Sequence, residues 1–333
     1  MGQTQRIEWI DLAKGICIVL VVFHHVMVNA NLDFTLSDAL SSFRMPLYFI
    51  LSGLFFKLYE GFVDFVKRKV NKLLIPFLFF LVTTSIIPFW ITHQGNSLVY
   101  FFNEHNGPVY NFSIWFLLCL FEINILFYLI QWVAGIVTQR FQTPLVLFVS
   151  ALLGCVGLFL ASREMWIPLY IGTTMTALPY FVFGWWLRRH THFLSSPVNV
   201  KLDIPLIVIC ALIVVFLSVH VTYSYNKIPR EGLATAHLCG IAGTMMVLLV
   251  AKIIKQIPCV SFWGRYSIII LCTHQLVIFA LSPALGGVLP EGWGRALLVF
   301  ALTLFVCHFL IIFMKKFLPH VTAQKDVIKV QRV

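Results

Sequence analysis

Three ionisable residues in the first apolar stretch of the chain fall on one helical face. An α-helix turns about 100° and rises about 1.5 Å per residue, so the step from Lys14 to His25 returns to within about 20° of one face over about 16 Å. Asp11 falls on the same stripe, whereas His24 points about 80° away. Titratable groups in such a segment are expensive, which makes each a functional candidate. Histidine suits acid–base catalysis near neutral pH; the structural alternative is an Asp–Lys pair at a helix end and a packed histidine.

The next apolar stretch carries Arg44 near its start and Ser52-Gly53 further along. We expect Arg44 at the outer membrane interface. There it is either an arginine that snorkels to water or a cation close to His25, since the first two helices are expected to be adjacent. Ser52-Gly53 is interpreted as a site of close helix packing in preference to a catalytic pair.

A basic cluster precedes the third apolar stretch, where Pro76 is expected to fix the start of the helix. The spacing of Arg68, Lys69 and Lys72 makes them neighbours at the entry of this helix. Such a cluster could hold a phosphate-bearing cytosolic molecule. The alternative is an orientation signal or an attraction to anionic lipids.

Two further groups lie deep in later apolar stretches. Glu122 follows Trp115 by seven residues, on the same face, and a buried carboxylate requires a partner, which we expect to be a cation or a histidine. His274 lies about ten residues into its stretch and is a further candidate site residue. Three other histidines are interpreted as hydrogen-bonded structural residues: His220, His237 and His308.

The elements that must position these groups are membrane-spanning helices. Of the 333 residues 60% are hydrophobic and 11% charged, which excludes a soluble enzyme, a disordered chain and a nucleic-acid-binding domain. The sequence predicts an all-α integral membrane protein with about ten spans, at 10–29, 43–59, 73–92, 113–133, 144–161, 169–187, 204–222, 234–254, 266–283 and 295–314. The eight cysteines show no paired or metal-type spacing and are interpreted as small buried hydrophobic residues, with no disulfide and no metal site.

The basic residues predict the orientation of these spans. If the N-terminus lies in the cytoplasm and the spans alternate, all but five of the 24 lysines and arginines fall on the cytoplasmic side, the exceptions being Arg44, Arg163, Lys227, Arg230 and Arg295. The net charge of +11 is therefore mainly a topology signal, with both termini in the cytoplasm. We divide the chain into a transmembrane domain, 1–314, and a basic cytoplasmic tail, 315–333.

Six motifs in order resemble those of the acyltransferase 3 family, the membrane-bound O-acyltransferases of surface glycans. A D-x-x-R/K-G segment with a histidine eleven residues after its basic residue is matched by Asp11, Lys14 and His25, and an aromatic MPLFF-x-x-SG segment by Met45 to Gly53. The remaining matches are Lys69, Lys72 and Pro76; Trp115-Phe116-Leu117; Phe181 to Gly184 with Arg188; and Gly264, Arg265, Ser267 and His274. The chain departs from many members by carrying lysine at position 14, which keeps the charge but loses the bidentate fork of arginine. In carrying this lysine, the chain resembles the branch of the family that contains fucose O-acetylase-like proteins.

The resemblance implies an O-acetyltransferase of the bacterial cytoplasmic (inner) membrane. It would move an acetyl group from cytosolic acetyl-CoA to a hydroxyl of a cell-surface or lipid-linked glycan, without a metal. His25 would be the general base, with Arg44 stabilising negative charge on the carbonyl oxygen and Lys14 and Asp11 at the inner mouth of a channel. The CoA phosphates would be held by Arg68, Lys69 and Lys72. Direct transfer and an acyl-histidine intermediate both stay open.

A proton-coupled transporter or exporter of an envelope precursor is the alternative function, and a scaffold for envelope assembly is a third. Transporters typically show matching broken helices in two halves, and the polar residues here gather in the first four spans and near His274. The expected partners are the glycan acceptor, acyl-CoA and membrane lipids, with no nucleic acid; a homo-oligomer is left open. Aromatic residues of the outer loops would either stack on sugar rings or form an interfacial belt: Tyr110, Tyr223, Tyr225 and Trp293.

Overall fold

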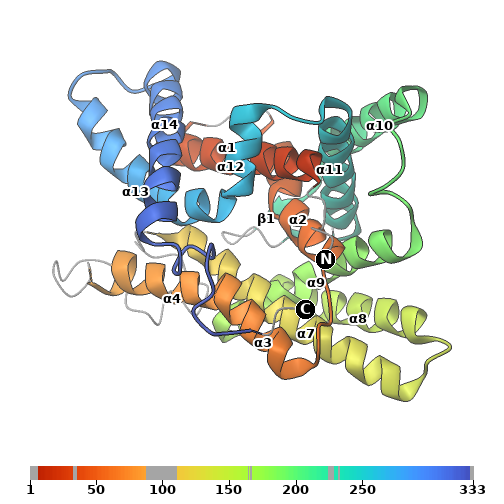
Figure 1. Cartoon of the computed structure of the whole chain (residues 1–333). Coiled ribbons are helices and arrows are strands. Elements are labelled where there is room, and N and C mark those ends of the chain that lie inside the picture. The colour runs from red at the N-terminus through yellow and green to blue at the C-terminus, as the bar shows by residue number, and fades with distance from the viewer. Residues whose placement is uncertain are drawn as a thin grey trace. The chain divides into compact units, whose positions relative to one another are not determined.

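The fold is almost entirely helical, as expected for an all-α membrane protein (Figure 1). The computed structural model describes residues 7–32, 36–87, 111–163, 165, 167–223, 229–231 and 233–330. Tyr110 and Tyr225 lie outside these residues. The α-helices are α1 (Glu8–Asn29), α2 (Ser37–Leu54), α3 (Phe62–Lys69), α4 (Ile75–Leu81), α7 (Trp115–Val137), α8 (Gln142–Ser162), α9 (Ile171–His190), α10 (Val200–Ser218), α11 (Leu233–Ile254), α12 (Pro258–Arg265), α13 (Ser267–Gly286) and α14 (Trp293–Phe317). Short π- and 3-10 segments extend several of them: η1 (Val70–Leu74), η2 (Val82–Ile86), η3 (Phe112–Ile114) and η4 (Pro168–Tyr170).

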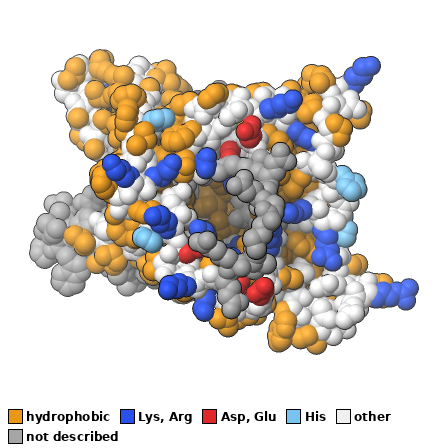
Figure 2. Space-filling model, viewed as in Figure 1, with side chains coloured by type: hydrophobic (Ala, Val, Ile, Leu, Met, Phe, Trp, Pro, Cys, Tyr) orange, Lys and Arg blue, Asp and Glu red, His pale blue; other side chains and the backbone are white. Residues whose placement is uncertain are grey.

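Eight helical segments in the described part of the chain are long and apolar enough to cross a membrane. Helices α2 and α9 have the length of a span but carry more polar residues, and with them the segments follow the order of the ten predicted spans. A two-stranded antiparallel ladder, β1 (Thr222–Tyr223) with β2 (Pro229–Glu231), links α10 to α11. Large apolar side chains such as Phe148 and Phe216 are 66% exposed, and orange hydrophobic atoms cover much of the visible surface (Figure 2), as a lipid-facing surface requires.

The third span starts earlier than the sequence predicts. A continuous helical segment runs from Phe62 through η1, α4 and η2 to Ile86, so the prediction that Pro76 starts the helix is wrong. Proline has no N–H to donate and normally interrupts a helix. Here the π-turn Val70–Leu74 precedes it, and the Ile75 N–H donates to the Val70 carbonyl five residues back. This wider turn carries the helix past the proline and places the basic cluster inside the helix.

The chain divides into two compact units. Unit 1 comprises Met1–Tyr48, Ser195–Val219 and Ala234–Phe313, and unit 2 comprises Phe49–Leu194, His220–Leu233 and Met314–Val333. In unit 1, α1 packs against α12 and α13. In unit 2, α7, α8 and α9 pack together, and α3, η1 and α4 pack against α7.

In each unit a helix crossing is closed by glycines that belong to the motifs. In unit 1, a Cβ at Gly264 would lie 1.8 Å from the Asp11 carbonyl oxygen, and one at Gly15 would lie 2.0 Å from the Val260 carbonyl oxygen. In unit 2, a Cβ at Gly53 would lie 1.8 Å from the Phe181 carbonyl oxygen. Any larger side chain would push these backbones apart. The prediction that Ser52-Gly53 marks close helix packing is therefore confirmed for the glycine.

The motif on α9, Phe181 to Gly184 with Arg188, also contributes to the contact between α2 and α9. A Cβ at Gly184 would lie 1.9 Å from the Ile50 carbonyl oxygen, so Gly53 and Gly184 serve the same α2–α9 crossing. Arg188, one turn further along α9, donates from Nη1 to the Leu54 carbonyl at 3.0 Å, and its guanidinium lies 5.5 Å from the centre of the Phe55 ring. The cation thus caps the C-terminal end of α2. These motif residues hold helices together.

Candidate functional site

The first candidate site is a pair of histidines in unit 1. The ring centres of His25 on α1 and His274 on α13 are 5.1 Å apart, at 46° to one another, although 249 positions separate the residues in sequence. The ring of His24 lies 5.5 Å from that of His25. His25 is half-buried, whereas His274 is fully buried. The sequence predicted both as separate candidates, and the structure brings them together.

Hydrogen bonds orient this pair. His274 Nδ1 lies 2.8 Å from the Ile270 carbonyl, which can only accept, so Nδ1 donates and Nε2 of the neutral ring accepts. The side-chain nitrogen of Gln275 lies 3.4 Å from His25 Nδ1. Sequence reasoning missed Gln275. The available signal was its position beside His274, at the end of a run of three polar side chains that begins with Thr273.

Asp11 and Lys14 lie on the N-terminal half of α1, which is a continuous helix, so the predicted stripe is present. Their backbone serves packing, because the Asp11 carbonyl faces Gly264 and the Lys14 carbonyl accepts from the Tyr48 hydroxyl at 3.1 Å. Lys14 remains about 16 Å along the helix from His25. Asp11 and Lys14 at one end of the stripe are therefore separated along α1 from His25 at the other end.

Arg44 lies inside unit 1, with only 3% of its surface exposed. A snorkelling arginine would reach water, so that alternative is wrong. Its Nε donates to the Leu40 carbonyl at 3.0 Å and its Nη2 to Ser41 Oγ at 2.8 Å, both on its own helix. Its carbonyl accepts from Cys17 Sγ at 3.0 Å, which places the Arg44 backbone level with Cys17, about 12 Å along α1 from His25.

The second candidate site is a polar pocket of about 250 Å³ in unit 2. It brings together all three predicted phosphate-binding residues with a serine from α2, an asparagine from α7 and an acid from the C-terminal segment. The lining residues are Ser52, Tyr59, Arg68, Lys69, Lys72, Leu73, Leu120, Asn124 and Asp326. Ser52 therefore does more than accompany the packing glycine, because it lines this pocket.

Each cation of the pocket has a defined neighbour. Arg68 Nε lies 2.7 Å from Asp64 Oδ2, one turn back on the same helix, and its guanidinium lies 4.6 Å from the centre of the Tyr59 ring. Lys69 Nζ lies 5.3 Å from the centre of the Phe65 ring. Lys72 Nζ lies 3.0 Å from Asp326 Oδ1. These contacts hold three cations around one space, which is an arrangement suited to a polyanion.

Asn124 and Asp326 are the pocket residues that sequence reasoning missed. Asn124 is buried, and its side-chain nitrogen donates to the Leu120 carbonyl at 2.7 Å. Its position on α7 two residues after Glu122 offered a weak signal. Asp326 is acidic within a segment that the sequence presents as a basic tail, and only the fold brings it to Lys72.

Glu122 and Trp115 lie on α7 but do not line this pocket. The Thr174 hydroxyl on α9 donates to Glu122 Oε2 at 2.8 Å, so a neutral donor contributes to holding this carboxylate. Trp115 is buried and stacks on Tyr170, with ring centres 5.7 Å apart at 29°. We assign Glu122 to the α7–α9 contact and Trp115 to the contact between α7 and η4.

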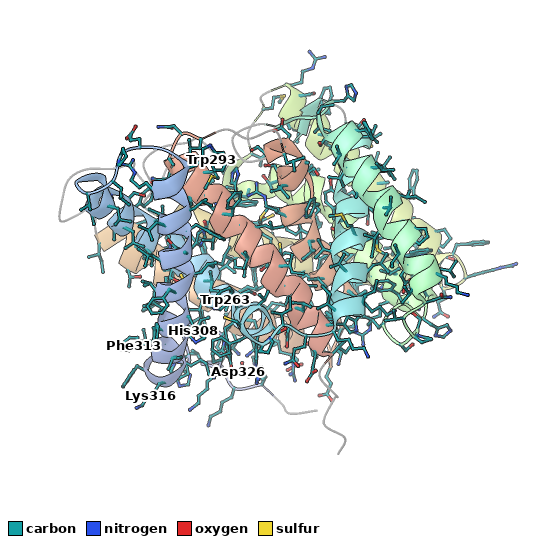
Figure 3. All side chains as sticks on the ribbon, turned by 90° about the horizontal axis from the view of Figure 1, so that it is seen from above. Trp263, Trp293, His308, Phe313, Lys316 and Asp326 are labelled. Atoms are coloured by element: carbon teal, nitrogen blue, oxygen red, sulfur yellow. The ribbon has the colours of Figure 1, made fainter. Side chains whose placement is uncertain are left out.

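Two smaller predictions can also be compared with the structure. Trp263 Nε1 donates to His308 Nδ1 at 3.3 Å (Figure 3), which confirms His308 as a hydrogen-bonded structural histidine. All eight cysteines are free, and six of them are buried.

A family model described as an acyltransferase domain matches residues 7–312, nearly the whole chain. The protein therefore belongs to the acyltransferase 3 family and is a multi-pass membrane acyltransferase. This membership favours the enzyme over the transporter and scaffold alternatives. No curated protein and no solved structure gives a significant match to the chain. The resemblance to the fucose O-acetylase-like branch stays a prediction.

Proposed function

We propose that the protein moves an acetyl group from cytosolic acetyl-CoA to a hydroxyl of a cell-surface or lipid-linked glycan, in the cytoplasmic membrane of a bacterium. The observation that carries this proposal is the histidine pair of unit 1, a half-buried His25 beside a buried His274 in helices that are mostly apolar. Membership of an acyltransferase family supports the acyl-transfer chemistry.

The reaction requires a base. A sugar hydroxyl has a very high pKa, so its proton must leave as its oxygen attacks the thioester carbonyl. In this proposal His25 takes that proton, the tetrahedral intermediate collapses, and the proton passes from His25 to the departing CoA sulfur. With the Gln275 amide turned so that its oxygen accepts from His25 Nδ1–H, the free lone pair of His25 lies on Nε2, and the His274 ring packs beside it. In the alternative route the His25 ring attacks the thioester carbonyl and the CoA thiolate leaves. The sugar hydroxyl then attacks the acyl-histidine, and the released imidazole takes the hydroxyl proton.

We assign the donor to the pocket of unit 2. Arg68, Lys69 and Lys72 are assigned to the phosphates of acetyl-CoA, because cations that converge on one space suit closely spaced phosphate charges. Arg44 is assigned to the negative charge that develops on the carbonyl oxygen, and Lys14 with Asp11 to the entry of the donor. The two sites thus supply two parts of one reaction.

The test of this proposal is the acetylation state of the host surface glycans, measured by mass spectrometry with His25→Ala protein. Loss of O-acetyl groups is expected. His24→Ala is the matched control, because it removes an adjacent histidine that points about 100° away, and it should keep acetylation. Normal acetylation with correctly inserted His25→Ala protein would overturn the assignment of the base.

A further inference from the structure

The chain after α14 is folded in the described residues 318–330. The N–H groups of Gln324 and Lys325 both donate to the Pro319 carbonyl at 2.9 Å, which closes a turn. Thr322 is buried, and its hydroxyl donates to the Leu318 carbonyl at 2.9 Å. We call residues 318–330 the C-terminal segment. It belongs to the same unit as the basic pocket.

Asn71 fixes this segment in place. It lies in the π-turn Val70–Leu74 and is fully buried. Its Oδ1 accepts from the N–H groups of Val327 and Ile328 at 3.0 and 2.9 Å, and its Nδ2 donates to the Ile328 carbonyl at 2.8 Å. One amide side chain therefore binds two consecutive backbone units, as a neighbouring strand would. Contacts of this kind define the position of the residue that precedes them.

That residue is Asp326, which Figure 3 labels and which lines the basic pocket. Its Oδ1 lies 3.0 Å from Lys72 Nζ, and the Lys72 ammonium also donates to the Ala323 carbonyl at 3.0 Å. The side chains of Lys72 and Asp326 are 49% and 37% exposed, so both are hydrated. An ion pair this exposed is weak and can be exchanged for another anion.

The carboxylate of Asp326 competes with a phosphate for Lys72. Three cations of the pocket face two carboxylates, since Asp64 pairs with Arg68 and Asp326 with Lys72. The Asp64 pair is formed within one helix and can persist. Asp326 is held by a separate segment, and a phosphate that approaches Lys72 would be repelled by it unless it moves. A phosphate carries more charge and more acceptor oxygens than a carboxylate, so it should win the exchange.

We propose that the C-terminal segment is a wall of the donor pocket and that Asp326 occupies the position of a donor phosphate until that phosphate displaces it from Lys72. This inference rests on the proposed function, which assigns the pocket to acyl-CoA. Asp326 then lowers the affinity for CoA and helps to expel the CoA product, because it recombines with Lys72 as the phosphate leaves. Asn71 is a positioning residue that returns Asp326 to the pocket.

The experiment is a titration of purified protein with CoA by calorimetry, with Asp326→Asn as the test variant. The amide keeps the shape of the side chain and removes its charge. The Kd for CoA should fall roughly two- to fivefold, which is the range expected from releasing one exposed ion pair. The Kd for pantetheine, which carries no phosphate, should not change. An unchanged or weaker affinity for CoA would overturn the inference.

Glu291→Gln is the matched control, because Glu291 is an exposed carboxylate that does not line the pocket and whose Oε1 lies 3.2 Å from Arg295 Nη2. It should leave the Kd for CoA unchanged, and an equal tightening there would overturn the inference by showing a general charge effect. Lys72→Ala in the same assay separates the two proposals. If it does not weaken CoA binding, the donor assignment itself fails. If it weakens binding while Asp326→Asn does not tighten it, only the present inference fails.

Asn71→Leu tests how the segment is held. The leucine removes all three hydrogen bonds at similar volume, so trypsin should cut after Lys325 and Lys329 faster than in the wild-type protein. Unchanged cleavage with a correctly folded variant would show that Asn71 does not hold the segment, and would overturn its positioning role.

Discussion

The histidine pair of unit 1 and the basic pocket of unit 2 place their polar groups in opposite surroundings. His274 is fully buried on an apolar helix and donates to a backbone carbonyl of that helix. Lys72 is half exposed and pairs with a 37% exposed acid from a different segment. A buried imidazole keeps a fixed orientation, as a residue that positions the neighbouring base His25 requires. A hydrated ion pair exchanges readily, as a site that must bind and release a polyanion requires.

The two units also share a structural feature, which is a helix crossing closed by glycines. In each, a pair of motif glycines lets two helices touch backbone to backbone: Gly15 and Gly264 in unit 1, Gly53 and Gly184 in unit 2. The six family motifs therefore contain two kinds of residue. Some are assigned to the chemistry in our proposal, and others bring together the helices that carry them.

The largest effect is expected from closing one of these crossings. Gly184→Ala should destabilise unit 2 by about 3 kcal/mol, because its Cβ would lie 1.9 Å from the Ile50 carbonyl oxygen. Gly172→Ala in the same helix, with nothing within 4 Å of the new Cβ, should leave the protein as stable or slightly more stable. Thermal unfolding in detergent measures both. Equal midpoints would contradict the packing role of Gly184.

The next largest effect is expected on the KM for acetyl-CoA, and it distinguishes the role of the basic pocket from that of the histidine pair. Lys69→Ala and Lys72→Ala should each raise the KM for acetyl-CoA by about tenfold, since each removes a charge-assisted hydrogen bond, and should leave kcat nearly unchanged. Higher salt should raise the wild-type KM and have less effect on the variants. Lys67→Ala, on the same helix but exposed and outside the pocket, is the control. A KM that stays constant in all three variants would leave the basic cluster as an orientation signal.

A smaller effect, on kcat, is expected from changing Gln275 beside the histidine pair. Gln275→Leu should lower kcat by roughly fivefold through the loss of one hydrogen bond to the His25 ring, and should not change the KM for acetyl-CoA. Gln275→Glu should move the acid limb of the kcat–pH profile to higher pH, because a carboxylate beside the imidazole favours its protonated form. Wild-type kcat and pH profile in both variants would remove Gln275 from the site.

The smallest effect concerns a residue assigned to neither site. Thr174→Val removes the hydroxyl donor to Glu122 and should lower the unfolding free energy by about 1 kcal/mol, while kcat and KM stay close to wild type. Thr83→Val, whose exposed hydroxyl bonds only its own helix backbone, should change stability less. If Thr174→Val instead abolished activity, Glu122 would belong to the catalytic apparatus.

The sequence was most informative where a pattern is local. Span order follows from hydropathy, and the grouping of Arg68, Lys69 and Lys72 follows from their spacing on one helix. The start of the third span was misjudged because a π-turn lets the helix pass Pro76, and no local rule announces that turn. The sequence predicts Arg44 at an interface because charge usually seeks water, whereas Arg44 is buried inside unit 1 and donates to its own helix backbone and to Ser41.

The remaining site residues depend on contacts that are distant in sequence. Nothing in the sequence pairs His25 with His274, because that contact requires α1 to pack on α13. Asp326 reaches Lys72 from a segment that Asn71 binds through the two residues that follow it. Helical spacing cannot predict either contact.

The most direct test measures CoA binding and acetyl transfer on the same purified proteins, with radiolabelled acetyl-CoA as the donor. His25→Ala should bind CoA with the wild-type Kd and lose acetyl transfer by a factor of about 10²–10⁴, the range of a lost general base. The double variant Lys69→Ala/Lys72→Ala should bind CoA weakly and still transfer acetyl groups at saturating donor. Acetyl transfer at the wild-type rate by His25→Ala would contradict the account.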